Sequence, residues 1–291
     1  MIDLHVHSIY SDGCDTPAEL VKLALSSGVK ALALTDHDTT DGVEDFILAC
    51  KEASLPGIVG VELSAHVSSG TLHILGLGFN PSDKPLMDAL VRIRNSREER
   101  NHRILEKLNQ LGVALTWEEV QSFAGDEVVG RPHFAQAMIA RGMAESVAEV
   151  FERFLQKGAP AYVDRFRPSP AECVELIRNA GGIPVVAHPL SWEYDIPALE
   201  AGLLELKEAG LLAIEAYHSS HSGGDVVELL RLANKHKFLV TGGSDYHGSS
   251  VKPNVRLGLG NGSTPAPDSL LPSLIPYMAP EGYLFGKEVL A

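Results

Sequence analysis

Two histidines stand two positions apart at the start of the chain, in the segment MIDLHVHS. Apolar and polar residues alternate here with the period of a β-strand, so His5 and His7 are expected on one face of that strand. Two parallel imidazoles at a strand end suit a divalent metal ion. A coincidental pair, with one histidine buried and hydrogen-bonded, is the alternative, and the rest of the chain decides between them.

Similar side chains accompany the other apolar segments. Strands are expected at residues 30–36, 57–64, 71–79, 183–189, 211–218 and 238–247, and each carries a histidine or a carboxylate near one end. Together with the first strand and its loop they supply nine candidate metal ligands: His5, His7, Asp12, His37, Glu62, His73, His188, Asp245 and His247. Nine ligands are too many for one ion, so the clustering predicts a multinuclear metal site.

The chemistry of these ligands narrows the choice of metal. All nine offer nitrogen or oxygen, and none is a thiolate. Imidazole suits zinc, iron and manganese, whereas carboxylates suit manganese and magnesium. The mixture favours two or three Mn²⁺ ions, with Fe²⁺, Zn²⁺ or Mg²⁺ as alternatives. A carboxylate such as Glu62 could bridge two ions, and clustered dications would activate water and bind the oxygens of a phosphate.

The order of elements indicates what positions these side chains. Strands alternate with helices that start at caps such as Thr16–Pro17 and Ser169–Pro170 and stop at glycines. This alternation is typical of a parallel sheet or barrel with helices outside, and about seven strands favour a barrel. The candidate ligands would then gather at the C-terminal ends of the strands.

A mostly helical stretch interrupts the alternation. Residues 95–165 are interpreted as a helical insertion domain that caps the substrate, and residues 1–94 with 166–291 as the barrel domain. The loop-rich tail after Asn261 matches no pattern that gives it a role.

Composition narrows the class of protein. The 291 residues are 45% hydrophobic and 21% charged, as in a folded chain with a sizeable core. The net charge of −14 disfavours long nucleic acid as a partner, although metals could still attract a small anionic substrate. Three widely spaced cysteines fit a reducing compartment, and no apolar stretch is long enough to cross a bilayer. We therefore expect a cytoplasmic protein with no membrane partner.

These motifs together resemble those of the PHP family, named for polymerase and histidinol phosphatase. The segments DLHVHS, SDG, ALTDHDT, GVELS, HILGLGF, VAHP and GGSDYHG follow the family's order. The resemblance implies a distorted (β/α)7 barrel of the α/β class with a two- or three-metal phosphoesterase centre. It implies three ligand sets: His5, His7, Glu62 and Asp245; Glu62, His73 and His188; and Asp12, His37 and His247.

The insertion resembles that of stand-alone PHP phosphoesterases, which include 3′,5′-nucleoside bisphosphate phosphatases and a 5′→3′ exoribonuclease of short RNA. Its segments REERN, GRPHFA and KGAPAYV carry Arg100, Asn101, Arg131, His133 and Lys157, which could bind a second phosphate. A solvated helix face with paired charges is the alternative. His218 and His221, in the segment YHSSH, could stack on a base or donate to a phosphate, and exposed loop positions are the alternative.

We therefore expect a metal-dependent phosphomonoesterase that removes the 3′-phosphate from a small nucleotide with two phosphates, such as adenosine 3′,5′-bisphosphate. His188, Asp245 and His37 are the expected catalytic residues, which would move or hold protons beside the metals. One alternative is a 5′→3′ exoribonuclease on short 5′-phosphorylated RNA. The other is a non-catalytic, metal-binding regulatory module.

Overall fold

The computed structural model describes residues 1–124, 129–193, 195–261 and 265–284. It divides into two compact units, Met1–Leu90 with Arg167–Ala291, and Val91–Phe166. The predicted insertion at 95–165 lies within the second unit. Part of the tail, at 262–264 and 285–291, lies outside the described residues.

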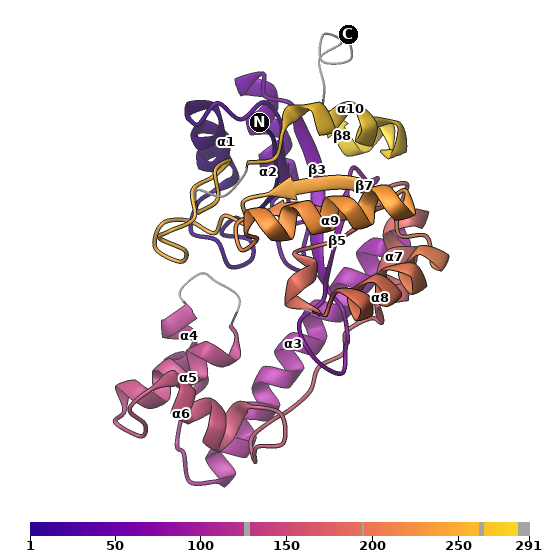
Figure 1. The fold of residues 1–291 in the computed structure, drawn as a ribbon. Helices are drawn as coiled ribbons and strands as arrows, with labels where there is room; N and C mark the ends of the chain where they lie inside the picture. Colours follow the sequence, from indigo (N-terminus) through magenta and orange to yellow (C-terminus); the bar gives the residue numbers. More distant parts are fainter. Residues whose placement is uncertain (125–128, 194, 262–264, 285–291) are drawn as a thin grey trace. The chain divides into compact units, whose positions relative to one another are not determined.

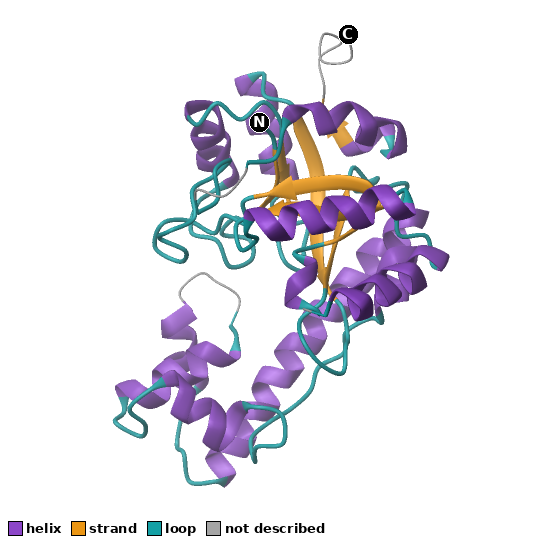
Figure 2. Ribbon diagram, in the orientation of Figure 1, coloured by secondary structure: helices purple, strands orange, loops and turns teal. Residues whose placement is uncertain are grey.

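The first unit is built on seven strands that neighbour one another in sequence order. They are β1 (Asp3–Val6), β2 (Leu32–Leu34), β3 (Gly57–Ser64), β4 (His73–Leu77), β5 (Ile183–Val186), β6 (Ala213–His218) and β7 (Leu239–Gly243). Just after β7, the Asp245 N–H donates to the His5 carbonyl at 2.8 Å, and the His7 N–H donates to the Tyr246 carbonyl at 2.9 Å. These bonds bring β1 and β7 together, so the sheet nearly closes into the predicted α/β barrel. The strands lie inside this unit, with helices outside them (Figure 2).

One strand runs against the direction that the alternation of strands and helices predicted. β4 is antiparallel to both β3 and β5, whereas a parallel barrel was expected. The eight residues between Ser64 and His73 are too few for a helical crossover, so the chain returns as a hairpin. His73 therefore begins its strand, opposite Ser64 at the end of β3. It still lies at the rim where the parallel strands end.

The helices around the strands include α1 (Pro17–Ser26), α2 (Val43–Ala53), α7 (Pro170–Asn179), α8 (Ile196–Glu208) and α9 (Gly223–His236) (Figure 1). As the sequence predicted, α1 and α7 start after the caps Thr16 and Ser169, and each cap forms a capping box. Apolar residues of α1 and α2, such as Leu20 and Phe46, pack with Leu32 of β2. This packing fixes the strands, and through them the side chains at their ends.

The second unit is helical in the part that the structure describes. It contains most of α3 (Lys84–Gln110), then α4 (Trp117–Ala124), α5 (Arg131–Ala140), α6 (Val147–Val150) and the π-helical turn η1 (Phe151–Leu155). Ile104, Leu108, Phe134, Met138 and Leu155 are among the residues of its own apolar core. No helix among the described residues of the chain has the length and apolar character needed to cross a membrane.

The tail covers the barrel at the end where the parallel strands begin. It forms η3 (Asp268–Leu270), α10 (Leu271–Leu274), η4 (Ile275–Tyr277), η5 (Pro280–Gly282) and β8 (Tyr283–Leu284), which pairs with β3. Leu274 and Met278 pack with Ile2, Ala31 and Ile183, at or just before the first residues of three strands. The tail, to which the sequence analysis gave no role, thus closes the core opposite the candidate ligands.

Candidate metal centre

Glu62, near the end of β3, is buried at the centre of the predicted site. Its Oε2 lies 3.2 Å from Nε2 of His5 and 3.1 Å from Nε2 of His7. The same oxygen lies 3.2 Å from Nδ1 of His37, which follows β2. Side chains from three neighbouring strands therefore meet at one carboxylate oxygen.

The other oxygen of Glu62 faces two further histidines. Oε1 lies 2.7 Å from Nδ1 of His73 and 3.1 Å from Nε2 of His188. Five protonated imidazoles around one buried carboxylate would repel one another strongly. Neutral imidazoles whose nitrogens converge with carboxylate oxygens are instead a donor set for metal ions. The residues present therefore fit metals on both sides of Glu62.

Asp245 follows β7 and divides its two oxygens between different partners. Oδ1 lies 3.6 Å from Nε2 of His5 and 3.4 Å from Nε2 of His7. Oδ2 accepts a hydrogen bond from Lys252 Nζ at 2.6 Å and lies 3.4 Å from Nε2 of His218. Oδ1 thus faces the predicted ligands, and Oδ2 accepts a hydrogen bond from the ammonium group of Lys252.

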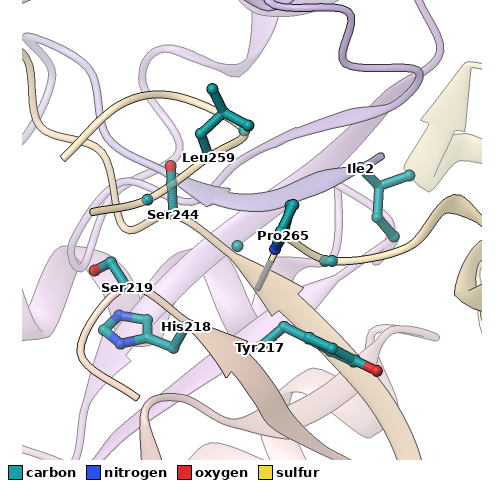
Figure 3. A pocket seen from close by; sticks show the side chains of 11 residues that line it. Ile2, Tyr217, His218, Ser219, Ser244, Leu259 and Pro265 are labelled. Carbon is teal, nitrogen blue, oxygen red and sulfur yellow. The ribbon is translucent and has the colours of Figure 1, made fainter. Parts of the chain in front are cut away.

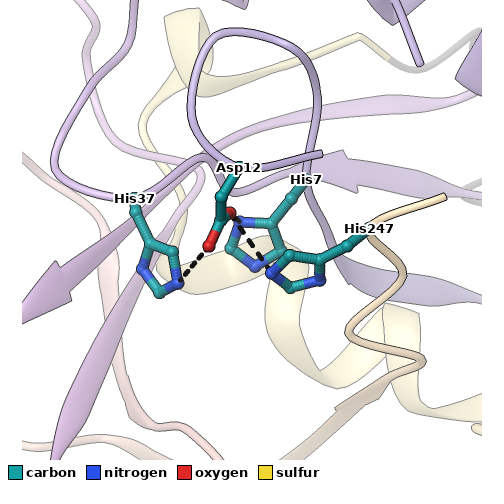
Figure 4. A group of neighbouring side chains, drawn as sticks. All are labelled: His7, Asp12, His37 and His247. Atoms are coloured by element: carbon teal, nitrogen blue, oxygen red, sulfur yellow. Dashed lines mark ion pairs between the residues drawn. The ribbon is translucent and has the colours of Figure 1, made fainter. Parts of the chain in front are cut away.

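Asp12, in the loop after β1, forms another group with His7, His37 and His247 (Figure 4). Its Oδ1 lies 3.2 Å from Nε2 of His247 and 3.5 Å from Nδ1 of His7, and its Oδ2 lies 3.7 Å from Nε2 of His37. Ligand atoms within 4.8 Å of one another also define two more groups made only of predicted ligands: His5, His7, Glu62 and Asp245; and His37, Glu62 and His73. With His188 beside Glu62, the structure brings all nine predicted ligands together.

Two buried aspartates at the end of β2 support the loops that carry ligands. Asp36 accepts hydrogen bonds from the N–H and hydroxyl of Ser8 and from the hydroxyl of Ser11, which precedes the predicted ligand Asp12. Asp38 accepts from the N–H and hydroxyl of Ser64, at the end of β3. Such hydrogen bonds orient metal ligands, although the residues that make them do not bind the metal.

Burial and charge oppose each other in the pKa values of this centre. Burial would raise the pKa of Glu62 and of Asp245, but the surrounding histidines hold both well below their ordinary values. Burial would lower the pKa of His7, but its carboxylate partners raise it to about 10. For His37 burial prevails and lowers the pKa to about 3. The carboxylates are therefore ionised, and metals would displace protons from histidines such as His7.

Two of the nine residues have a left-handed backbone, with φ of 27° at His188 and 55° at Asp245. Residues other than glycine hold this conformation only where their surroundings fix it. The His188 N–H donates to Oε2 of Glu215 at 2.8 Å, and the Asp245 N–H donates to the His5 carbonyl. The unfavourable backbone conformations therefore occur at two predicted metal ligands.

The five residues expected to bind a second phosphate lie in the second unit: Arg100, Asn101, Arg131, His133 and Lys157. Asn101 Nδ2 and Arg131 Nη1 donate to backbone carbonyl groups at 2.8 and 3.2 Å. His133 Nδ1 accepts the N–H of Gly130 at the start of α5. Lys157 is exposed. Asn101 and Arg131 thus also stabilise their own unit.

His218 and His221 are buried, unlike histidines in an exposed loop. His218 Nδ1 accepts the N–H of Ser220 at 3.1 Å, which places the proton of the neutral imidazole on Nε2. That Nε2–H faces Asp245. His221 Nδ1 donates to the carbonyl of Ala216 at 2.9 Å. His218 is therefore placed as a hydrogen-bond donor at the centre, and His221 supports β6.

A small cavity lies beside His218, between the ends of β6 and β7 and the loop that contains Leu259 (Figure 3). Its walls include Tyr217, Ser244 and Pro265. Its volume of about 10 Å³ is room for roughly one water molecule, too little for a nucleotide. This cavity is therefore not a substrate site.

A barrel that gathers histidines and carboxylates in overlapping groups at one rim defines a class of protein, the metal-dependent hydrolases. A model of the PHP domain matches residues 3–153. The chain belongs to the PHP family and is a metal-dependent phosphoesterase.

Comparison with known proteins gives similar chains over most of the length. The chain is 34% identical over 247 residues to a 3′,5′-nucleoside bisphosphate phosphatase of Chromobacterium violaceum, covering 84% of this chain and 87% of that protein. It is 32% identical over 246 residues to a 5′-3′ exoribonuclease of Haemophilus influenzae, covering 84% and 89%. A crystal structure from Bifidobacterium adolescentis, assigned as a metal-dependent phosphoesterase, matches with a TM-score of 0.77 at 30% identity, covering 95% and 96%.

Glu215 and Lys252 are not among the site residues predicted from the sequence, although both touch residues of the centre. Glu215 is a lone carboxylate in the apolar segment LLAIEAYH, which is a usable signal, because a buried charge needs a partner. Lys252 lies in a loop after β7, where no local pattern distinguishes it from a solvated lysine.

Proposed function

We propose that this enzyme removes the 3′-phosphate from 3′,5′-bisphosphorylated nucleosides, such as adenosine 3′,5′-bisphosphate. The convergence of nitrogen and oxygen donors about Glu62 carries the proposal, because clustered dications can bind and polarise a phosphate monoester. The similarity to the Chromobacterium violaceum phosphatase supports the substrate class. A cytoplasmic location remains a prediction from the cysteine pattern.

Manganese is the proposed metal, in two or three ions, because the donors combine imidazole and carboxylate without thiolate. The proposed ligand sets are His5, His7, Glu62 and Asp245; Glu62, His73 and His188; and Asp12, His37 and His247. When bound, the ions would supply Lewis acid chemistry and lower the pKa of water. Fe²⁺, Zn²⁺ and Mg²⁺ are the alternatives.

Protein groups at the rim would orient the phosphate and manage protons. Nε2–H of His218 and Nζ of Lys252 both lie beside Oδ2 of Asp245, so either could donate to a phosphate oxygen or to the departing 3′-oxygen. Asp245, His188 and His37 are proposed to hold or pass a proton beside the bound phosphate. The lowered pKa of His37 keeps it neutral at neutral pH, so its ring nitrogens offer a lone pair to a metal ion.

The second phosphate of the substrate is assigned to Arg100, Asn101, Arg131, His133 and Lys157. Residues 91–166 contain eleven basic and eleven acidic side chains, so the formal net charge of −14 belongs to the rest of the chain. An anion therefore meets less repulsion from this unit than from the barrel. Substrates without the 5′-phosphate would lose the charge-assisted hydrogen bonds to this set and would react more slowly.

The test is phosphate release by the Mn²⁺-loaded protein, with product identification. We expect adenosine 3′,5′-bisphosphate to give adenosine 5′-monophosphate much faster than adenosine 3′-monophosphate or adenosine 5′-monophosphate releases phosphate. Arg131→Gln should reduce this preference by lowering kcat/KM for the bisphosphate alone. Equal rates on the bisphosphate and on both monophosphates would contradict the assigned 5′-phosphate site.

A second function is favoured by the similarity to the Haemophilus influenzae exoribonuclease. Short RNA with a 5′-phosphate presents the same first atoms as a bisphosphorylated nucleoside, with a chain on the 3′-oxygen. Release of 5′-mononucleotides from such RNA, at rates above those on the bisphosphate, would make this the main activity. Metal binding without turnover of either substrate would support the regulatory module instead.

A further inference from the structure

We propose that Glu215 is a positioning residue that fixes two ligands of the metal centre through one buried carboxylate. Glu215 lies on β6, and its side chain is fully buried (0% exposed). Its Oε1 lies 3.0 Å from Nδ1 of His5, and its Oε2 accepts the backbone N–H of His188 at 2.8 Å. The proposal rests on the metal centre proposed above, and not on which phosphate ester is hydrolysed.

The contact with His5 fixes which ring nitrogen faces the metals. An ionised carboxylate only accepts hydrogen bonds, so a neutral His5 must carry its proton on Nδ1 and its lone pair on Nε2. That Nε2 lies 3.2 Å from Oε2 of Glu62 and 3.6 Å from Oδ1 of Asp245. The carboxylate therefore orients the imidazole and makes it a stronger ligand.

The contact with His188 stabilises a backbone conformation that is otherwise unfavourable. His188 has a φ of 27°, which a residue with a side chain rarely adopts. Its N–H is satisfied by Glu215, while its Nδ1 lies 2.6 Å from Oγ of Ser191. Both contacts direct Nε2 of His188 toward Glu62, at 3.1 Å. One carboxylate on β6 thus links ligands that belong to β1 and β5.

A β-bulge explains how β6 can supply two side chains to the centre. The register between β6 and β7 shifts between Glu215 and Tyr217. In a regular strand, side chains three positions apart point to opposite faces, so Glu215 and His218 would be separated. The extra residue changes the direction of the side chains that follow it, as bulges beside active sites do, so both Glu215 and His218 can face the centre. His221 donates to the carbonyl of Ala216, inside the bulge.

Direct ligation by Glu215 is the competing interpretation, because Glu215, His5 and His218 also have ligand atoms within 4.8 Å of one another. Both oxygens of Glu215 are already engaged by N–H groups. Nδ1 of His218 accepts from Ser220, so its Nε2 carries a proton and offers no lone pair to an ion. The contacts therefore favour positioning over ligation.

The experiment measures Mn²⁺ binding to the metal-free protein by titration calorimetry. Glu215→Gln keeps the size of the side chain but cannot accept from both N–H groups. We expect an unchanged number of bound ions, with affinity about 10- to 100-fold weaker. Thr241→Val is the matched control, because Thr241 is the buried partner of Glu215 on β7. It should bind Mn²⁺ like the wild-type protein.

Two results would overturn the proposal. Loss of one equivalent of Mn²⁺ in Glu215→Gln would make the residue a ligand, and wild-type affinity would give it no part in the centre. A second measurement needs no variant: nitrogen-15 spectra of the zinc-loaded protein with labelled histidines. We expect the His5 proton on Nδ1, and a proton on Nε2 would also refute the proposal. Neither measurement uses a phosphate ester, so both are independent of the substrate assignment.

Discussion

At the residue scale, Glu62 is distinguished by its two oxygens, which face different histidines. Oε2 faces His5, His7 and His37, whereas Oε1 faces His73 and His188. A carboxylate engaged in this way can bridge two ions. The affinity for both would then depend on one side chain.

We expect Glu62→Gln to weaken Mn²⁺ binding by more than about 100-fold, because loss of a bridging ligand should exceed the effect of an orienting residue. Phosphate release should fall with it. Glu44→Gln, at an exposed position of α2, is the control and should match the wild-type protein in both respects. Wild-type affinity for Mn²⁺ in Glu62→Gln would contradict the central role of Glu62.

His218 is predicted to act on the substrate and not on the metals. His218→Phe keeps a ring but removes the Nε2–H beside Asp245, and we expect kcat to fall by about 100-fold or more. The number of bound Mn²⁺ ions should stay the same. His236→Phe, at the end of α9, is the control histidine. A change in metal stoichiometry would instead identify His218 as a ligand.

The pH dependence of metal binding follows from the raised pKa of His7. Its pKa of about 10 in the metal-free protein means that a proton must leave before the nitrogen can bind an ion. Apparent Mn²⁺ affinity should therefore rise from pH 6 to pH 9, with proton release. Calorimetry in buffers of different ionisation enthalpy measures that release. An affinity independent of pH would show that His7 is already neutral.

At the element scale, the close approach of β7 to β1 decides where His5 lies. A Cβ atom at Gly243 would lie 2.4 Å from both the backbone nitrogen and the Cβ of His5. Side chains cannot approach so closely, so only glycine lets the two strands pack and close the barrel.

Gly243→Ala should therefore displace β1, costing about 1–3 kcal/mol of stability, and should weaken Mn²⁺ binding through His5. Thermal unfolding of the metal-free protein and metal titration measure the two effects. Gly223→Ala, at the start of α9, is the matched control, since its Cβ would meet no atom within 4 Å. If both variants behaved alike, the close packing of β1 and β7 would have no energetic importance.

At the scale of the whole molecule, the barrel has a metal centre at one rim and an apolar seal at the other. The barrel unit carries the net charge of −14, so a phosphate would be repelled from the rim without cations. Metals at Glu62 and its neighbours would reverse that local field. The tail at the opposite rim contributes stability instead of chemistry.

Leu274→Ala tests this separation of roles. Leu274 is fully buried in the seal (0% exposed), so its truncation should cost about 2–5 kcal/mol of unfolding free energy. Mn²⁺ stoichiometry should not change, because the metal centre lies at the other rim. Tyr277→Ala, at a position 45% exposed, should alter stability by less than about 0.5 kcal/mol. Loss of metal binding in Leu274→Ala would show that the two rims are coupled.

The sequence by itself determined the seven strands, their order and the set of side chains at their ends. These features are local: alternation, caps and polar residues at strand ends can be read within a few positions. Tertiary structure alone decided the direction of β4, the seal formed by the tail, the bulge in β6 and the contacts of Glu215 and Lys252. Glu215 meets His5 from 210 positions away, and no local pattern specifies such a pair. The physical reason is that a buried carboxylate takes its role from the donors that folding brings to it.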